Sequence, residues 1–346
     1  MRRLHARPIQ VTVLALLVAG AAVVALAAAV GFRAFADAFS DPHLAWLPVT
    51  AIAALLAVPA YVLPHRAVAR LEGGPRIRLG PIACVVMAGF GPAAAAGGFV
   101  LDKRALHALE GDERRATERV LGLGALEWAL LAPAAWISAV LLLFDDDRRP
   151  MGSLLWPWAI AVPLGFAFGF WLAVPSRRER IEAGGGRWRR GLGQALRGVG
   201  MLGTLARSFR TTWTAWVGMA LYWALELASF YAAARFIGLH VNVGELILAY
   251  ATGYALTRRS LPLAGAGVAE LLLSVSLHWV GQPLAAALAV TVVYRFFNFV
   301  LPILPSLLVH PRVEPLLAAA ERRRSLARRT RRRPPAPSRA GSNSGT

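Results

Sequence analysis

The chain has 346 residues, 57% of them hydrophobic, and a mean hydropathy of +0.51. Several apolar runs approach or exceed the ~20 residues that a helix needs to cross a bilayer, which excludes a soluble globular protein. The formal net charge of +19 lies in loops and tails, where membrane proteins carry it, and no recognition fold for nucleic acid accompanies it. The only cysteine is Cys84, and the seven histidines do not pair at ligand spacing, so we predict neither a metal nor another cofactor.

Six apolar runs are predicted to span the membrane as helices. The first follows Arg2, Arg3 and Arg7 and is long enough to span. A signal peptide, the alternative, would have a shorter core and a small-residue cleavage site, so we interpret this run as a retained helix. The six predicted spans are 11–31, 44–63, 118–144, 153–174, 212–236 and 284–309.

Loop charges predict the orientation, because Lys and Arg are in excess in cytoplasmic loops. The basic N-terminus (1–10), the arginine-rich linker 176–211 and the tail 311–346 are predicted to be cytoplasmic, and the net acidic loop 145–149 to lie outside. We expect the plasma membrane as the location. The end of the tail, 321–346, is rich in Arg, Pro, Ser and Gly, cannot bury a core and is predicted to be disordered.

Two further apolar segments, 79–101 and 245–280, are interrupted by glycine and proline. The loop after the second span carries Arg66, Arg70, Arg76 and Arg78 and is predicted to lie inside. Because Asp145 is predicted outside, only one full crossing fits between this loop and Asp145, and 118–144 supplies it. The segment 79–101 is therefore predicted to enter the membrane and return to the same side. By the same argument, 245–280 enters from the outside and returns there.

The order of helix, broken hairpin and helix occurs twice, in 44–144 and in 212–309, with opposite orientation. In each half a glycine precedes a proline by 35 residues, Gly98 with Pro133 and Gly267 with Pro302. This is the inverted-repeat plan of many secondary transporters, and chance similarity between Gly- and Ala-rich segments is the alternative. The predicted fold is an all-α polytopic membrane domain over 11–310, with about six full spans and two re-entrant hairpins.

Charged residues inside the second hairpin and the last span predict a substrate site. A charge at the bilayer centre costs roughly 2.5 to 3.5 kcal/mol on insertion scales, so such residues usually face a wet cavity and have a function. A helix predicted from Val268 would offer free N–H groups and a positive dipole to an anion, and guanidinium groups bind phosphate bidentately. The predicted substrate-binding residues are Arg258, Arg259, Gly265, Gly267, Glu270 and Arg295.

The structural alternative is that these arginines only neutralise Glu270 and Glu226 and so hold helices together. Glu226 and Glu127 lie in the middle of predicted spans, where they either relay protons or pair with cations. Asp102 follows the first broken hairpin and lies close to the predicted inner interface. Glu226, Glu127 and Asp102 are secondary candidates.

Enzyme signatures are absent from the sequence. It has no Walker P-loop, His-Glu-x-x-His, Gly-x-Ser-x-Gly or dinucleotide fingerprint, so we predict that the protein is not an enzyme. The pattern Gly165-x-x-x-Gly169 predicts close packing of one span against another.

Several short motifs resemble a known family: Leu261-Pro262, Gly265-x-Gly267-x-x-Glu270, Gly281, Tyr294-Arg295 and Gly97-Gly98. From about residue 11 to 309 the chain resembles the flippase-like membrane region of lysylphosphatidylglycerol synthases. Where that family usually has Pro-Gly-Gly-x-Gly-x-x-Glu, this chain has Leu263 and Ala264 in place of the proline and the first glycine, which leaves the loop geometry and the substrate open. In full-length synthases a soluble aminoacyltransferase domain follows, whereas an arginine-rich tail follows here.

The resemblance therefore implies lipid binding or translocation and not aminoacyl transfer. The expected function is to bind and translocate an anionic phospholipid or lipid-linked molecule. The alternative is a non-transporting membrane subunit that presents lipid to a separate enzyme or scaffolds it. Expected partners are the lipid, the membrane and either a partner enzyme or a second copy of the chain, but not nucleic acid.

Overall fold

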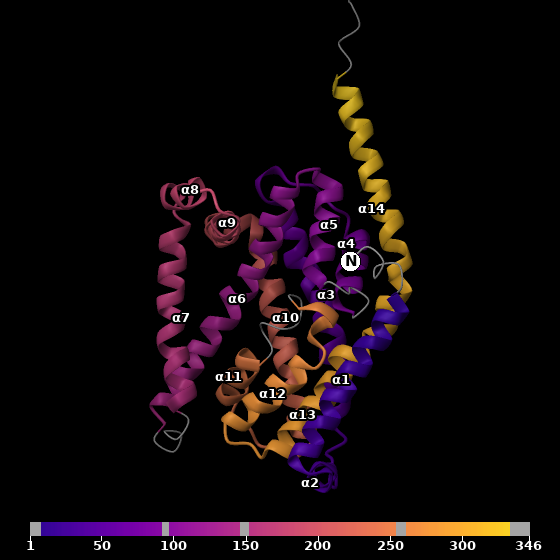
Figure 1. Cartoon of the computed structure of the whole chain (residues 1–346), viewed down its shortest axis with the longest axis vertical. Coiled ribbons are helices and arrows are strands. Elements are labelled where there is room, and N and C mark those ends of the chain that lie inside the picture. The colour runs from indigo at the N-terminus through magenta and orange to yellow at the C-terminus, as the bar shows by residue number, and fades with distance from the viewer. Residues whose placement is uncertain (1–7, 92–96, 146–151, 254–260, 333–346) are drawn as a thin grey trace, which may run out of the picture.

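The computed structural model describes residues 8–91, 97–145, 152–253 and 261–332. Within these ranges the regular secondary structure is helical throughout, with no strand. The long helices lie side by side along one axis, and two shorter ones, α8 and α9, lie across one end (Figure 1). The prediction of an all-helical fold is confirmed.

Among the residues that the structure describes, six helical segments are long and apolar enough to cross a membrane, and they coincide with the six predicted spans. Apolar side chains remain exposed on them, as on one face of α7 (Trp156, Ile160, Leu164 and Phe168), which suits a lipid environment. The spans comprise α1 (Pro8–Val30), α3 (Trp46–Arg70), α6 (Glu113–Leu143), α7 (Gly152–Ala173), α10 (Phe209–Phe236) and α13 (Leu284–Arg295), which continues through a π-helical turn (Phe296–Val300) into α14 (Ile303–Arg332).

Both interrupted segments contain two short helices instead of one long one. The first comprises α4 (Leu79–Phe90) and α5 (Gly98–Glu110), and the second α11 (Val243–Gly253), a 3-10 turn (Pro262–Gly265) and α12 (Val268–Trp279). The members of each pair pack against each other. The pair α4 and α5 lies toward one end of the molecule, and α11 and α12 lie toward the other (Figure 1).

The centre of the bundle is the packing of α3 against α10, which is the most extensive between any two helices described. A Cβ on Gly218 would lie only 2.6 Å from Leu63 Cβ and Pro64 Cδ, so the two backbones approach closely. Small residues permit such an approach between helices in membranes. The Ser229 hydroxyl also donates to the Thr50 carbonyl across this contact (3.0 Å).

The remaining helices are α2 (Phe32–Asp37), α8 (Pro175–Ala183) and α9 (Arg187–Arg207). In α9, Leu196, Leu202 and Leu205 are buried, and the helix packs against α6. The arginine-rich linker therefore turns its apolar face to the protein.

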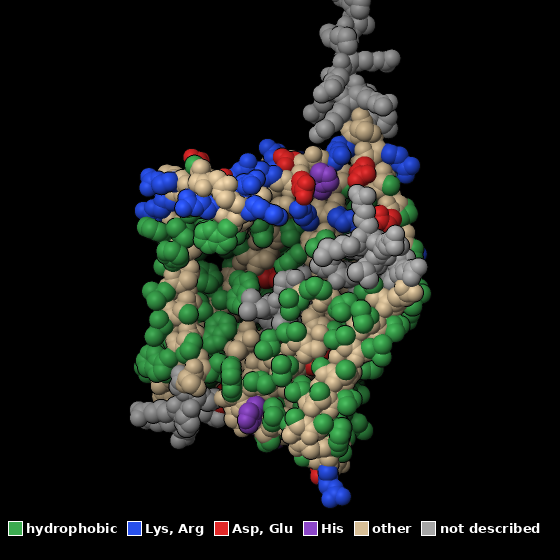
Figure 2. Space-filling model, in the orientation of Figure 1, with side chains coloured by type: hydrophobic (Ala, Val, Ile, Leu, Met, Phe, Trp, Pro, Cys, Tyr) green, Lys and Arg blue, Asp and Glu red, His purple; other side chains and the backbone are tan. Residues whose placement is uncertain are grey.

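Lys and Arg side chains form a layer at the end of the molecule where α8 and α9 lie, above a broad belt of hydrophobic side chains (Figure 2). We call this end the basic face. From it, α14 extends beyond the rest of the bundle and continues as helix to Arg332, through residues 321–332 for which we expected disorder. Arg324 on this extension donates to the His107 carbonyl at 2.7 Å. The rest of the predicted tail, 333–346, lies outside the described residues.

Candidate functional site

The predicted site is built on the turn that leads into α12. Gly265 (φ 72°) and Gly267 (φ 84°) adopt the left-handed backbone that glycine accommodates, and Leu263 (φ 56°) and Ala264 (φ 53°) adopt it without that advantage. Glu270, in the first turn of α12, accepts a hydrogen bond from the Gly267 N–H through Oε2 (2.6 Å). The carboxylate therefore caps the helix N-terminus and complements its dipole.

The first span, α1, forms one wall of this turn. Ala15 and Ala19 of α1 pack with the buried Ala264 and Ala266. A Cβ on Gly267 would lie 3.2 Å from Val18 Cγ1, so α1 runs directly beside the start of α12.

Glu270 also forms a buried ion pair with Arg295 at the end of α13. Arg295 Nε donates to Glu270 Oε1 at 2.7 Å, and the two residues are only 4% and 1% exposed. The guanidinium lies over the Phe299 ring, 4.3 Å from its centroid. Two predicted site residues are thus brought together across 25 positions, with both charges removed from solvent.

Glu226, in the middle of α10, is completely buried. Its Oε2 accepts hydrogen bonds from the Tyr294 hydroxyl (2.5 Å), the Asn298 amide (2.6 Å) and the Tyr250 hydroxyl (3.3 Å). Tyr294 and Asn298 lie on either side of Arg295 in the sequence, so one stretch of the last span carries both the ligands of Glu226 and the arginine of the ion pair. We call these interior residues the polar cluster: Glu226, Tyr250, Glu270, Tyr294, Arg295 and Asn298.

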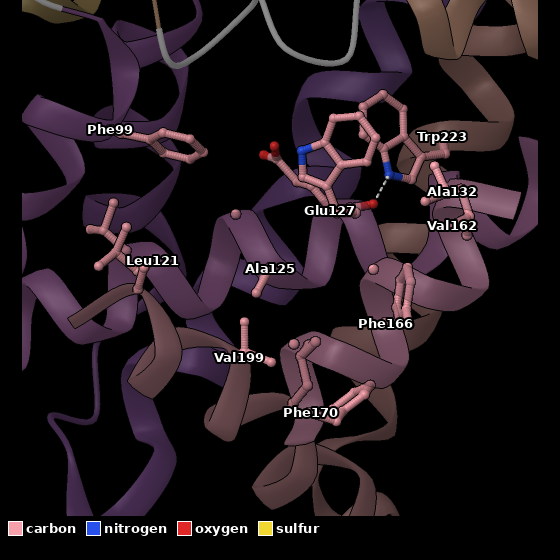
Figure 3. Close-up of a pocket in the computed structure, with 18 of the residues that line it drawn as sticks. Phe99, Leu121, Ala125, Glu127, Ala132, Val162, Phe166, Phe170, Val199 and Trp223 are labelled. Atoms are coloured by element: carbon pink, nitrogen blue, oxygen red, sulfur yellow. Dashed lines mark hydrogen bonds between the residues drawn. The ribbon is translucent and has the colours of Figure 1, made fainter. Parts of the chain in front are cut away.

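Glu127, the other mid-span carboxylate, lies on the wall of a cavity of about 540 Å³ between α6, α7, α9 and α10. Figure 3 shows its side chain near Phe99 and Trp223, with aromatic and aliphatic residues over most of the wall. Glu127 Oε1 accepts a hydrogen bond from the Tyr61 hydroxyl at 2.5 Å. This α6–α7 cavity is therefore an apolar space with one carboxylate on its wall.

The α6–α7 cavity adjoins the polar cluster through aromatic residues. Trp223 lines the cavity and donates its indole N–H to the Glu127 carbonyl at 2.9 Å. Its ring also meets that of Tyr250 edge-on, with centroids 6.0 Å apart, and Tyr250 bonds Glu226. One layer of aromatic side chains thus separates the two mid-span carboxylates.

Asp102 is fully buried, and His65 Nε2 lies 3.2 Å from its Oδ1. The reason is that α5 packs inside the bundle. The predicted close packing at Gly165 and Gly169 is wrong for the described part of the chain: no heavy atom there lies within 4 Å of a Cβ built on either glycine, and both line the α6–α7 cavity.

Arg258 and Arg259, the first two predicted phosphate ligands, lie outside the described residues. Three residues that hydrogen-bond the buried carboxylates were not predicted from the sequence: Tyr61, Tyr250 and Asn298. The only feature of the sequence that could have indicated their role is a polar atom within an otherwise apolar segment. Among the described residues there is no group of three or more His, Cys, Asp or Glu that could hold a metal ion.

A bundle of membrane-spanning length with ionised groups in its interior defines a helical membrane protein with an internal polar site. Residues 12–306 match the family described as the lysylphosphatidylglycerol synthase TM region, and the chain belongs to that family. No curated protein matches the chain in a direct comparison.

Proposed function

We propose that this protein binds an anionic phospholipid or lipid-linked molecule and translocates it across the plasma membrane. The observation that carries the proposal is the α6–α7 cavity, an apolar space of about 540 Å³ bounded by α9 of the basic face. Apolar walls suit acyl chains, and the arginines that α9 carries on the basic face suit a phosphate. The chain belongs to a family whose description names the synthase of a phospholipid, and this is consistent with a lipid ligand.

In this proposal the head group crosses the interior beside the polar cluster. Arg258, Arg259 and Arg295 hold its phosphate, Gly265 and Gly267 allow the backbone to approach it, and Glu270 orients the arginines. The burial of the Glu270–Arg295 pair supports this, because charges are rarely kept at such depth without a function. Glu226, Glu127 and Asp102 are the secondary candidates along the same route.

We also propose that the two halves form an inverted repeat with one re-entrant hairpin entering from each face. Two likenesses support it. Gly97 (φ 94°) and Gly267 (φ 84°) each precede the helix that follows a break. In that helix Asp102 and Glu270 are each buried beside a basic residue of a neighbouring span, His65 and Arg295 respectively.

Filling the cavity tests lipid binding there. Gly165→Leu places a side chain in the α6–α7 cavity, whereas Gly20→Leu places the same side chain on exposed α1, with open space at both positions. If the leucine displaces two CH₂ groups of a bound acyl chain, the lost burial of about 0.8 kcal/mol per group lowers the affinity for the lipid about tenfold. We expect Gly165→Leu to slow translocation of a fluorescent phosphatidylglycerol in proteoliposomes by about that factor and Gly20→Leu to leave it unchanged. Equal rates in the two variants would contradict the proposal.

Cysteine labelling tests the topology. With Cys84 replaced, single cysteines are placed at Asp146, His240, Gln282 and Arg339. An impermeant thiol reagent added to intact cells should label the first three and not the last, because both termini are proposed to be cytoplasmic. Labelling at Gln282 only after the cells are opened would remove the outward-facing hairpin and, with it, the inverted repeat.

A non-transporting membrane subunit that presents lipid to a separate enzyme is the second candidate. The observation that favours it is that Glu270 and Arg295 bond each other, as in a static structural pair. A translocating protein moves lipid when reconstituted alone. A scaffold would move no lipid when reconstituted alone and would copurify with an enzyme. Analysis of the lipids bound to the purified protein would identify the ligand in either case.

A further inference from the structure

A second large cavity, of about 1020 Å³, lies between the end of α3 and the junction of α9 with α10. We call it the α3–α10 cavity. Its third side is the segment after α3, which begins with a 3-10 turn (Leu71–Gly73). Nothing in the proposed function uses this cavity.

The cavity has a high content of cationic and hydroxyl groups. Arg66 and Arg70 lie one helical turn apart on α3, Arg76 faces them from the following segment, and Glu72 is the single acidic residue of the lining. Hydroxyl-bearing residues of α9 and α10 complete the wall, among them Thr204, Ser208 and Thr214. Three guanidinium groups against one carboxylate leave the lining net positive.

Arg66 has a donor without an acceptor. Its Nε is buried and makes no hydrogen bond to any of the described residues. A buried N–H left unsatisfied costs about 1 to 3 kcal/mol, so a shift of this side chain toward a ligand oxygen in the cavity would be stabilising.

The helix ends around the cavity also favour an anion. α10 begins at Phe209, between the lining residues Ser208 and Thr211, and directs its positive end there. The negative end of α3 would oppose this, but Arg119 donates to the Val68 and Leu71 carbonyls at 2.7 and 2.9 Å. Arg119 therefore compensates the dipole of α3. The negative end of α9, at Arg207, lies at the same junction, where Arg207 Nε donates to the Gly203 carbonyl (3.1 Å) and the Thr212 hydroxyl to the Leu205 carbonyl (2.8 Å).

The position of the cavity points to a lipid head group. The candidate spans Trp46–Gly73 and Phe209–Phe236 both end at its wall, so it lies where spanning helices leave the hydrocarbon. Phe209 and Trp213, on the first turns of α10, are 54% and 51% exposed, and aromatic residues gather at the membrane interface. A lipid phosphate would lie at that depth.

We propose that the α3–α10 cavity binds a phosphate group, carried by a lipid head group or by a free phosphate compound, through Arg66, Arg70 and Arg76. Guanidinium groups suit the paired oxygens of phosphate, and the hydroxyls supply further donors. The inference does not depend on translocation, because a bound phosphate at this face would serve a transporter and a scaffold equally.

Ligand-induced thermal stabilisation of the full-length protein in a neutral detergent tests the proposal, with short-chain phosphatidylglycerol as the probe. Arg66→Gln/Arg70→Gln removes two cations from the cavity. Arg180→Gln/Arg187→Gln removes two exposed cations from α8 and α9 of the same basic face, outside the cavity. We expect the half-saturating concentration to rise at least about tenfold in the first variant and to change less than about twofold in the second.

Equal changes in both variants, or none in the first, would overturn the proposal. If Arg66→Gln/Arg70→Gln does not fold, Arg70→Gln/Arg76→Gln, at two exposed positions, takes its place under the same criteria. Inorganic phosphate then distinguishes the source. If inorganic phosphate competes with the lipid, the cavity recognises the phosphate group alone. If it does not compete, the rest of the lipid is needed for binding. Either conclusion requires that the cavity variant has lost binding. A flipping assay on the same variants keeps this result separate from the test of translocation.

Discussion

Arg295→Gln should lower the free energy of unfolding by about 3 to 5 kcal/mol, since it leaves Glu270 charged, buried and without its cation. Glu270→Gln should destabilise in the same way by leaving Arg295 uncompensated. In the double variant Glu270→Gln/Arg295→Gln no net charge remains, and two amides can bond each other, so we expect most of the stability to return. Equilibrium unfolding of the four detergent-solubilised proteins measures these differences.

Translocation by the same four proteins distinguishes a substrate ligand from a structural pair. If Arg295 holds the phosphate, the double variant should recover stability while its lipid transport stays at least about tenfold below that of the unmodified protein, because a charge-assisted bond worth ~1.5 to 3 kcal/mol is missing. Recovery of both stability and transport would show that the pair only holds α12 to α13, and Arg295 would leave the proposed site.

Arg119→Met is the second substitution with a large expected effect. Arg119 is 5% exposed and joins three elements, since it bonds the last carbonyls of α3 and pairs with Glu110 of α5 at 2.5 Å. Burial raises the pKa of the Glu110 carboxyl, whereas the Arg119 charge acts to lower it. Without the guanidinium, two carbonyls and a carboxylate lose their hydrogen-bond donor. We expect the free energy of unfolding, measured by thermal or chemical denaturation, to fall by about 3 kcal/mol or more.

The matched control is Arg115→Met, one turn earlier on α6. Arg115 is exposed and meets Asp112 only at 3.7 Å, so its loss should change stability by less than about 1 kcal/mol. Arg119→Lys should recover only part of the loss, because an ammonium group cannot bond both carbonyls and the carboxylate in the planar geometry of a guanidinium. Similar losses for the methionine variants of Arg119 and Arg115 would show that Arg119 is not the residue that joins α3, α5 and α6.

The spans and their interruptions were predictable because hydropathy and helix breakers act locally. Gly267 with Glu270 three residues later is likewise a local signal, and the structure places the carboxylate on the Gly267 N–H. Arg295 was identifiable as an interior charge from its position within an apolar run.

Pairing of Glu270 with an arginine was among the predicted alternatives, but the partners of Glu226 and Asp102 were not predictable, because each lies on another helix. Glu226 bonds Tyr294 and Asn298 from about 70 positions away, and nothing in the composition of either segment indicates that contact. The burial of Asp102 depends on how α5 packs beside His65, and the cavity at Gly165 depends on a separation between helices. Such features arise from tertiary packing, which a single sequence does not encode in its periodicity.

By composition, α1 is an ordinary membrane anchor, but its alanines shape the loop that carries Gly267 and Glu270. Ala264 holds a left-handed backbone, and L-residues pay roughly 1 to 2 kcal/mol for that conformation. The residue itself does not favour this shape, so its neighbours on α1 and Phe299 must impose it. The first helix thus constrains the shape of the turn from outside, so the conformation of the turn does not depend on its own residues alone.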